Sequence, residues 1–163
     1  DLQRLPAGET GEIFMRRAEG TPETYRYLGA ESKPLEGGWE SIGDIGWLDE
    51  DGYLYLADRR TDMILVGGAN VYPAEVEAAI DDHPLVGSSC VIGLPDDDLG
   101  NKVHAIVQAK PGLTEADLMA HLADRLVIYK RPRTIEFTDE PLRDDAGKVR
   151  RSQLREDRLK ARG

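Results

Sequence analysis

A lysine beside a glycine is the first residue in this sequence that invites a chemical interpretation. Lys148 follows Gly147 in the stretch DDAGKVRRSQLR and directly precedes a segment that predicts a basic helix. Glycine permits a sharp backbone turn, and a lysine held by such a turn can present its charge to an anionic ligand. Arg150 and Arg151, which follow, are expected to face outward, toward solvent or a phosphate-bearing ligand.

Charge is distributed unevenly along the chain. The 163 residues carry a formal net charge of −10, but residues 130–163 contain 11 Lys and Arg against 7 Asp and Glu. This last segment therefore has a net charge of +4, and the preceding residues −14. A nucleic-acid backbone would be repelled by the acidic part, so a compact anionic ligand is favoured over nucleic acid. A solvated amphipathic helix is the alternative explanation for the arginines after Arg150.

The other chemically versatile residues show no pattern typical of a site. Cys90 is the single cysteine and lies in the apolar stretch SSCVIGL, so it is expected to be a small core residue rather than a nucleophile. His121 lies beside acidic residues on a predicted helix, but no second histidine or cysteine lies three or four residues from His83, His104 or His121, and no metal site is predicted.

Length and hydropathy limit the architecture. With 163 residues and 40% hydrophobic content, the chain can hold one ordinary domain, or a small domain with part of another. No apolar run approaches the roughly 20 residues of a membrane-spanning helix, and no charged-then-apolar leader opens the sequence. These features predict a cytoplasmic protein without a transmembrane segment.

The hydrophobic pattern changes near residue 60, at a boundary between two parts of the chain that we call the seam. Before it, the sequence predicts a strand in GEIFMRR (11–17), a polar loop, and a hairpin in 41–59 whose turn is DEDG. Residues 1–58 bury too little apolar surface for an independent domain, so we expect them to be the end of a larger, β-rich one.

Beyond the seam, the sequence predicts a small α+β domain of about 100 residues with a three-stranded sheet. A short strand pair flanks Gly67 and Gly68, and a helix begins at Pro73. Thr114 is expected to cap a second helix. Strands in 88–94, 102–110 and 133–138, with a final basic helix, complete a βαββαβα order.

Two long stretches carry a resemblance to a known family. GDIGWLDEDGYLYLADRRTDMILVGGANVYPAEVEAAI (43–80) and IYKRPRTIEFTDEPLRDDAGKVRRSQLR (128–155) are similar to the C-terminal part of the adenylate-forming superfamily, specifically its acyl-CoA synthetase (fatty-acid–CoA ligase) branch. The resemblance implies that residues 1–60 are the last β-subdomain of a large N-terminal domain and that residues 61–163 are a mobile C-terminal domain. The phosphate loop, adenine pocket and acyl pocket of such enzymes are expected outside this sequence.

The implied activity is an ATP-dependent carboxylic acid–CoA ligase, with fatty acids as the expected substrate class. Such an enzyme forms an acyl-adenylate and then a thioester with CoA. The implied cofactors are ATP, CoA and Mg²⁺, the metal being bound mainly by the missing N-terminal domain, and the isolated chain is expected to be inactive. The alternatives are an adenylation domain that loads a carrier protein and a binding module without turnover. The stretch 16–41 mildly suggests fatty or bulky polycyclic acids.

The resemblance also implies roles for individual residues. Lys148 would be the catalytic lysine that holds the substrate carboxylate and the nucleotide together. Asp44 would accept hydrogen bonds from both ribose hydroxyls, and Arg59 would reach the ribose and phosphates of ATP or AMP. Gly67 and Gly68 would leave room for the pantetheine arm of CoA.

The implied hinge between the two domains is Thr61, two residues after Arg59. Asp or Lys is usual at this position of the family, so the adjacent Asp62 is expected to share the role. Arg60 matches no required role and is expected on the surface.

Several acidic residues are assigned structural roles. Glu75 and Glu77 fall in the first turns of a predicted helix, where acidic side chains favour the helix dipole. Asp144 and Asp145 are expected to pair with Lys148 while it waits outside the active site.

Overall fold

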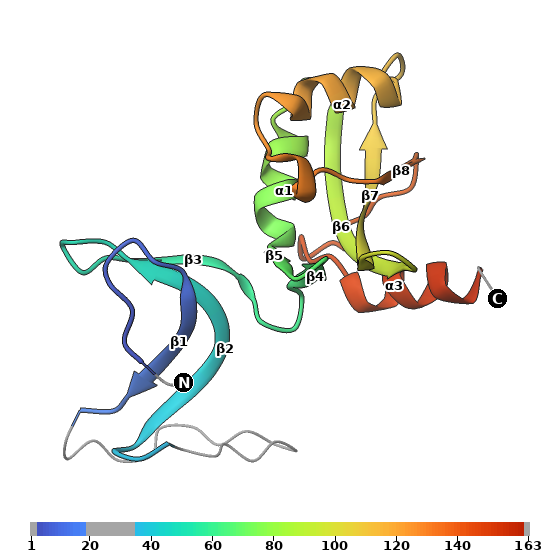
Figure 1. Ribbon diagram of the computed structural model, residues 1–163. Coiled ribbons are helices and arrows are strands. Elements are labelled where there is room, and N and C mark those ends of the chain that lie inside the picture. The colour runs from blue at the N-terminus through green and yellow to red at the C-terminus, as the bar shows by residue number, and fades with distance from the viewer. Residues whose placement is uncertain (1–2, 19–34, 162–163) are drawn as a thin grey trace. The chain divides into compact units, whose positions relative to one another are not determined.

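The computed structural model describes residues 3–18 and 35–161. The chain divides into two compact units, Asp1–Thr61 and Asp62–Gly163, which are drawn in Figure 1 and described here one at a time. The boundary follows Thr61, one residue from the predicted seam. Assignment of the units to a large domain and a mobile domain stays a prediction. In the described parts of the chain, no helix is long and apolar enough to cross a membrane.

The first unit contains an antiparallel sheet in the order β1–β2–β3, with strands Gly11–Arg16, Trp39–Leu48 and Leu54–Arg59. The predicted β2–β3 hairpin is confirmed. In its turn, the Asp49 carboxylate accepts the Tyr53 N–H at 2.8 Å. The polar loop predicted between β1 and β2 falls largely in residues 19–34, which lie outside the described residues. The stretch 16–41, which suggested a class of acyl substrate, overlaps this loop and lies mostly outside the described residues as well.

A glycine allows β2 and β3 to approach closely. A Cβ atom at Gly46 would lie 2.2 Å from the Tyr55 carbonyl oxygen, and the strand register shifts between Ile45 and Gly46. Beside this point the rings of Trp47 and Tyr55 stack with centroids 5.3 Å apart. The missing side chain therefore fixes how β2 meets β3.

The second unit confirms the predicted α+β fold class and the predicted order of its elements. Its sheet has the order β6–β7–β8, in which β6 and β7 are antiparallel and β7 and β8 are parallel, while β4 and β5 form a separate antiparallel pair. The elements are β4 Ile64–Val66, β5 Ala69–Val71, α1 Pro73–Asp81, β6 Val86–Asp96, β7 Gly100–Ala109, α2 Glu115–Ala123, the 3-10 turn η1 Ile128–Lys130, β8 Thr134–Thr138 and α3 Arg151–Lys160.

Both faces of this sheet are covered by helices. Alternate residues of a strand point to opposite faces. Val91 of β6 and Val103 of β7 pack in a cluster with apolar residues of α1 and α2. Cys90 and Ile106 belong to a second cluster with Leu142 and partly buried leucines of α3. The helices α1 and α2 therefore cover one face, and α3 covers the other (Figure 1).

The first two helices begin as the sequence predicts. Pro73 occupies the first turn of α1, and Thr114 caps α2 by accepting the Asp117 N–H at 3.2 Å. Glu75 has the predicted structural role, because both of its carboxylate oxygens accept hydrogen bonds from Lys130 Nζ at 2.7 Å. This pair joins η1 to α1.

Helix α3 is attached to the sheet largely by arginines. None of its residues is fully buried. Arg158 donates to both carboxylate oxygens of Glu136 on β8, at 2.6 and 3.1 Å, and Arg155 Nε donates to the Gly93 carbonyl at 2.8 Å. The hydrogen bond from Arg158 is the main reason that the pKa of Glu136 lies below its usual value. The position of α3 on the sheet is therefore set by directional polar contacts as well as by apolar packing.

The close approach at Gly46 gives a first prediction. Gly46→Ala should push β2 and β3 apart and destabilise the first unit by about 1–3 kcal/mol, the usual cost of overpacking. Near-UV circular dichroism during urea unfolding would follow the Trp47–Tyr55 stack. Gly43→Asn is the matched control, because a Cβ there meets nothing within 4 Å and Asn tolerates its φ of +77°. Equal stability of Gly46→Ala and the unmodified protein would contradict the prediction.

Candidate functional site

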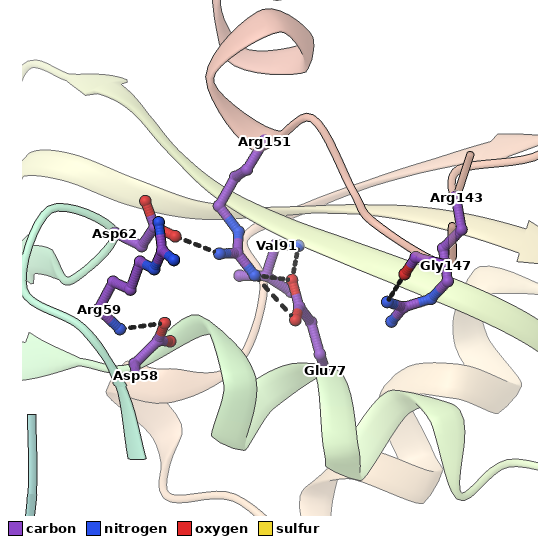
Figure 2. A network of polar contacts seen from close by, with 8 residues as sticks. All are labelled: Asp58, Arg59, Asp62, Glu77, Val91, Arg143, Gly147 and Arg151. Atoms are coloured by element: carbon purple, nitrogen blue, oxygen red, sulfur yellow. Dashed lines mark hydrogen bonds and ion pairs between the residues drawn. The ribbon is translucent and has the colours of Figure 1, made fainter. Parts of the chain in front are cut away.

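Asp44 and Arg59 are brought together by strand register. They are direct partners in the β2–β3 pair, which places their side chains on the same face of the sheet. Asp44 is half-buried and Arg59 is exposed. The Asp58 carboxylate accepts the Arg59 N–H at 2.8 Å (Figure 2). A carboxylate and a guanidinium side by side offer both acceptors and donors to an oxygen-rich ligand.

Arg60 is exposed, as expected, but it also has a structural role that the sequence did not indicate. Its guanidinium donates to both carboxylate oxygens of Glu12 on β1, at 2.8 and 3.0 Å. Glu12 also accepts the Ser41 hydroxyl, and this hydrogen bond is the largest cause of a lowered pKa at Glu12. These contacts connect β1 to the hairpin that carries Asp44.

Gly67 and Gly68 form the turn between β4 and β5, so the predicted strand pair is confirmed. Their φ angles are +55° and +88°, which fits the positive φ required at both central positions of a type I′ turn. Gly67 donates its N–H to the Leu99 carbonyl at 2.9 Å, and a Cβ there would lie 3.1 Å from the Leu99 side chain. A Cβ at Gly68 would meet nothing within 4 Å. A side chain at position 67 would be restricted by packing against Leu99, whereas a side chain at position 68 would be restricted only by the backbone conformation.

Lys148 stands on a turn that Asp144 organises. The Asp144 carboxylate accepts the N–H groups of Ala146 at 3.1 Å and Lys148 at 2.9 Å. The backbone N–H of Asp144 donates to the Lys148 carbonyl at 3.0 Å, and Gly147 donates back to the Asp144 carbonyl at 2.8 Å. Gly147 has a φ of +74°, in the left-handed region that favours glycine. The turn therefore has its own network of hydrogen bonds.

The expectation that Asp144 and Asp145 pair with the Lys148 side chain was wrong. The Asp144 carboxylate binds backbone N–H groups, and no carboxylate of the described residues forms an ion pair with Lys148 Nζ. The Lys148 side chain is exposed and lines an open cavity of about 280 Å³ together with Arg143 and Arg150. Arg143 also donates to the Gly147 carbonyl at 3.2 Å. The cavity is thus rich in cationic groups.

Arg151 does not face outward, and this expectation was wrong. Its guanidinium donates to Asp62 at 2.5 Å and to both carboxylate oxygens of Glu77 at 2.8 and 2.9 Å (Figure 2). Burial lowers the pKa of Arg151, but the hydrogen bonds and charge of Glu77 and the charge of Asp62 outweigh it, so the pKa is raised. Arg150, by contrast, is exposed.

Glu77 is a buried acid rather than a surface residue that only favours the helix dipole. It is 9% exposed and accepts the Val91 N–H of β6 at 2.7 Å in addition to the two bonds from Arg151. A buried carboxylate requires such partners because removing its charge from water is costly. The structural role of Glu77 is thus confirmed, but its hydrogen-bond partners lie on other elements, β6 and α3.

The cysteine and the histidines have structural contacts. Cys90 is completely buried, and burial is the main reason that the pKa of its thiol is raised to about 11, so it is a core residue as expected. His104 is buried with Nδ1 2.8 Å from the Thr134 hydroxyl, and His83 contacts His121 edge to face. The described residues contain no group of three or more His, Cys, Asp or Glu that could hold a metal ion.

Comparison with known proteins identifies the family. Residues 75–148 match the family described as AMP-binding enzyme C-terminal domain, a match that ends at Lys148. The chain is 43% identical over 149 residues to a 2-succinylbenzoate–CoA ligase of Geobacillus kaustophilus, covering 90% of this chain and 30% of that protein. The chain belongs to the AMP-binding, adenylate-forming enzymes. It spans about 30% of the length of the curated relatives that it matches.

Two further relatives extend this AMP-binding assignment. A fatty acid–[acyl-carrier-protein] ligase of Streptomyces coeruleorubidus is 39% identical over 156 residues, covering 94% of this chain and 30% of that protein. The solved structure of an O-succinylbenzoate coenzyme A synthetase from Bacillus subtilis, in complex with ATP and magnesium ion, aligns with a TM-score of 0.79 at 34% identity, covering 93% of this chain and 32% of that one. The roles of Lys148, Asp44, Arg59, Gly67 and Gly68 remain predictions.

The network around Asp144 gives a second prediction. Asp144→Ala removes the acceptor of two backbone N–H groups. The amide of Lys148 should then exchange with solvent about tenfold faster, as expected for a net loss of about 1.5 kcal/mol in a hydrogen bond to a charged group. Asp145→Ala is the matched control, since the neighbouring carboxylate has no such bonds among the described residues. Equal exchange in both variants would show that Asp144 does not organise the turn.

Proposed function

We propose that the full-length protein containing this chain is an ATP-dependent carboxylic acid–CoA ligase. The observation that carries the proposal is Lys148, an exposed cation on a turn with its own hydrogen-bond network and with no ion-pair partner among the described residues. Such a lysine is ready to bind an anion without first breaking an internal contact. The acid–thiol ligases among its relatives support the same activity.

The first proposed step joins the carboxylic acid to AMP. A carboxylate oxygen attacks the α-phosphorus of ATP, the bond to the β-phosphate oxygen breaks, and pyrophosphate leaves. Both reactants are anions, so Lys148 would bind the carboxylate and the nucleotide together and offset the charge that develops between them. Asp44 would accept the ribose hydroxyls, and Arg59 would bind near the ribose and phosphates.

The second proposed step transfers the acyl group to CoA. The thiolate of CoA attacks the acyl carbon, the bond to the phosphate oxygen breaks, and AMP leaves. The Gly67–Gly68 turn would pass beside the pantetheine arm, because it has no side chains to block it. A change of position between the two steps would pivot at Thr61 and Asp62, where the two compact units meet in sequence.

Mg²⁺ enters this scheme with ATP rather than as a metal of this chain. The described residues contain no cluster suited to a metal ion. We therefore propose that Mg²⁺ is bound by the triphosphate and mainly by residues of the large N-terminal domain. We also propose the cytoplasm as the location, on the sequence argument above; fractionation of producing cells would test it.

The acid substrate and the acyl acceptor are each assigned a candidate. Fatty acids are our proposed substrate class, and loading of a carrier protein is the second candidate function, favoured by the 39% identity to a ligase that acts on an acyl-carrier-protein. Supplying the full-length enzyme with free CoA or with a phosphopantetheinylated carrier protein, and measuring thioester formation by mass spectrometry, separates the two. Faster transfer to the carrier protein would favour the second candidate.

A third prediction addresses the proposed role of Lys148. In the full-length enzyme, Lys148→Ala should slow acid-dependent pyrophosphate release by about 10²–10³-fold, as expected for the loss of one preorganised charge contact. Thioester formation from supplied acyl-adenylate should be nearly unchanged. Lys160→Ala removes an exposed lysine from α3 and serves as the control. Equal loss in both half-reactions would exclude a role confined to adenylation.

A fourth prediction concerns Gly68. Gly68→Asn should preserve the β4–β5 turn, because Asn tolerates left-handed backbone and the space around Gly68 is open. The added side chain should nevertheless obstruct the pantetheine arm and slow thioester formation from acyl-adenylate by roughly tenfold or more, as misplacement of a reactant does. Pyrophosphate release should be retained. Gly52→Asn makes the same change at a left-handed glycine of the β2–β3 turn, and an equal effect there would refute the specific role.

A further inference from the structure

The ion pair between Arg151 and Asp62 connects the segment after Lys148 with the predicted hinge. Asp62 is the first residue of the second compact unit, directly after Thr61. Arg151 is the first residue of α3 and lies three residues after Lys148. Figure 2 shows the Arg151 side chain reaching from the start of α3 to the carboxylates of Asp62 and Glu77. Residues 89 positions apart in sequence are thereby held together.

This contact fixes Asp62 within the second unit. The Arg151 side chain is 20% exposed, and those of Asp62 and Glu77 are 28% and 11% exposed, so water screens the three charges only partly. Glu77 is in turn bound to the Val91 N–H of the central sheet. Asp62 is thus connected through one guanidinium to α1, β6 and α3.

The two predicted reactive turns of this unit depend on Arg151 to different extents. Ile64 and Val66 of β4 and Val71 of β5 are buried in the main core, which holds the Gly67–Gly68 turn independently of α3. The turn that carries Lys148 is attached on one side through Leu142. On its other side it is attached through a partly buried Val149 and then Arg151. Loosening Arg151 should therefore affect Lys148 more than the glycine turn.

We propose that Arg151 is a positioning residue that fixes Asp62 to the second unit, ends the flexible joint at Thr61, and sets the position of Lys148 relative to that joint. This inference rests on the proposed function for its kinetic consequence. It assigns Thr61 as the pivot, because Asp62 then moves with the second unit as part of a rigid body. The planar fork of arginine suits this role, since one side chain must bind two carboxylates in different directions.

The experiment uses the full-length enzyme with Asp62→Asn and Arg151→Lys. Asparagine keeps the size of Asp62 but loses its charge, and lysine keeps the charge of Arg151 but loses the fork. Both variants should increase hydrogen exchange in a peptide spanning 143–150. Both should slow acid-dependent pyrophosphate release by about 10- to 100-fold, the effect of a misplaced catalytic group, and slow thioester formation from acyl-adenylate much less.

Arg158→Lys is the matched control on the same helix. Arg158 also binds a carboxylate with two nitrogens, but its partner Glu136 lies on β8 rather than beside Thr61. If Arg151 only attached α3 to the sheet, Arg158→Lys would cause the same exchange and the same kinetic pattern, and the proposal would be wrong. Confinement of both effects to Arg151→Lys and Asp62→Asn supports it.

Asp62→Asn carries the test if Arg151→Lys does not fold, because Asp62→Asn leaves the Arg151–Glu77 contact in place. Unchanged exchange and unchanged rates in Asp62→Asn would overturn the proposal. Absence of acid-dependent pyrophosphate release in the unmodified enzyme would instead overturn the proposed function, and the exchange measurement would still decide whether Arg151 positions the Lys148 turn.

Discussion

The guanidinium of Arg151, enclosed by two carboxylates, is the contact on which the second unit most depends. A charge removed from water is stable only when its partners are close and well oriented, and here Glu77 and Asp62 supply them. Because Glu77 belongs to α1 and Arg151 to α3, the pair reaches past the sheet edge that separates the two helices. Removal of Arg151 would take the cation from both Glu77 and Asp62, whereas removal of Asp62 alone would leave the Arg151–Glu77 pair in place.

The two faces of the β6–β7–β8 sheet are stabilised in different ways. Aliphatic residues of α1 and α2 pack against one face, where the position of a helix is set by shape and volume. On the other face α3 adds partly buried leucines and three arginines, whose hydrogen bonds have fixed directions. This difference places the rigid apolar core behind the glycine turn and leaves the segment around Lys148 dependent on polar geometry.

Most of the fold could be predicted because its signals are local. Asp-Gly turn chemistry, Pro73 and Thr114 mark the hairpin and two helices whatever the rest of the chain does. The direction of Arg151 could not be predicted in this way, because helical spacing after Lys148 does not reveal a partner 74 positions earlier. A signal was nevertheless present: Glu77 directly follows Val76, which is completely buried, and a buried acid requires a cation. The roles of Asp44 and Arg59 came from family resemblance, and the structure adds their shared strand pairing.

The burial of Cys90 has a practical consequence for spectroscopy. Maleimide dyes and nitroxide spin labels react with thiolates, and a completely buried thiol with a pKa of about 11 presents almost none near neutral pH. Within this chain, a cysteine introduced at an exposed position of either compact unit would therefore be labelled selectively without removing the native one. Pairs of labels on the two sides of Thr61 would convert any change in the separation of the units into a measurable distance distribution.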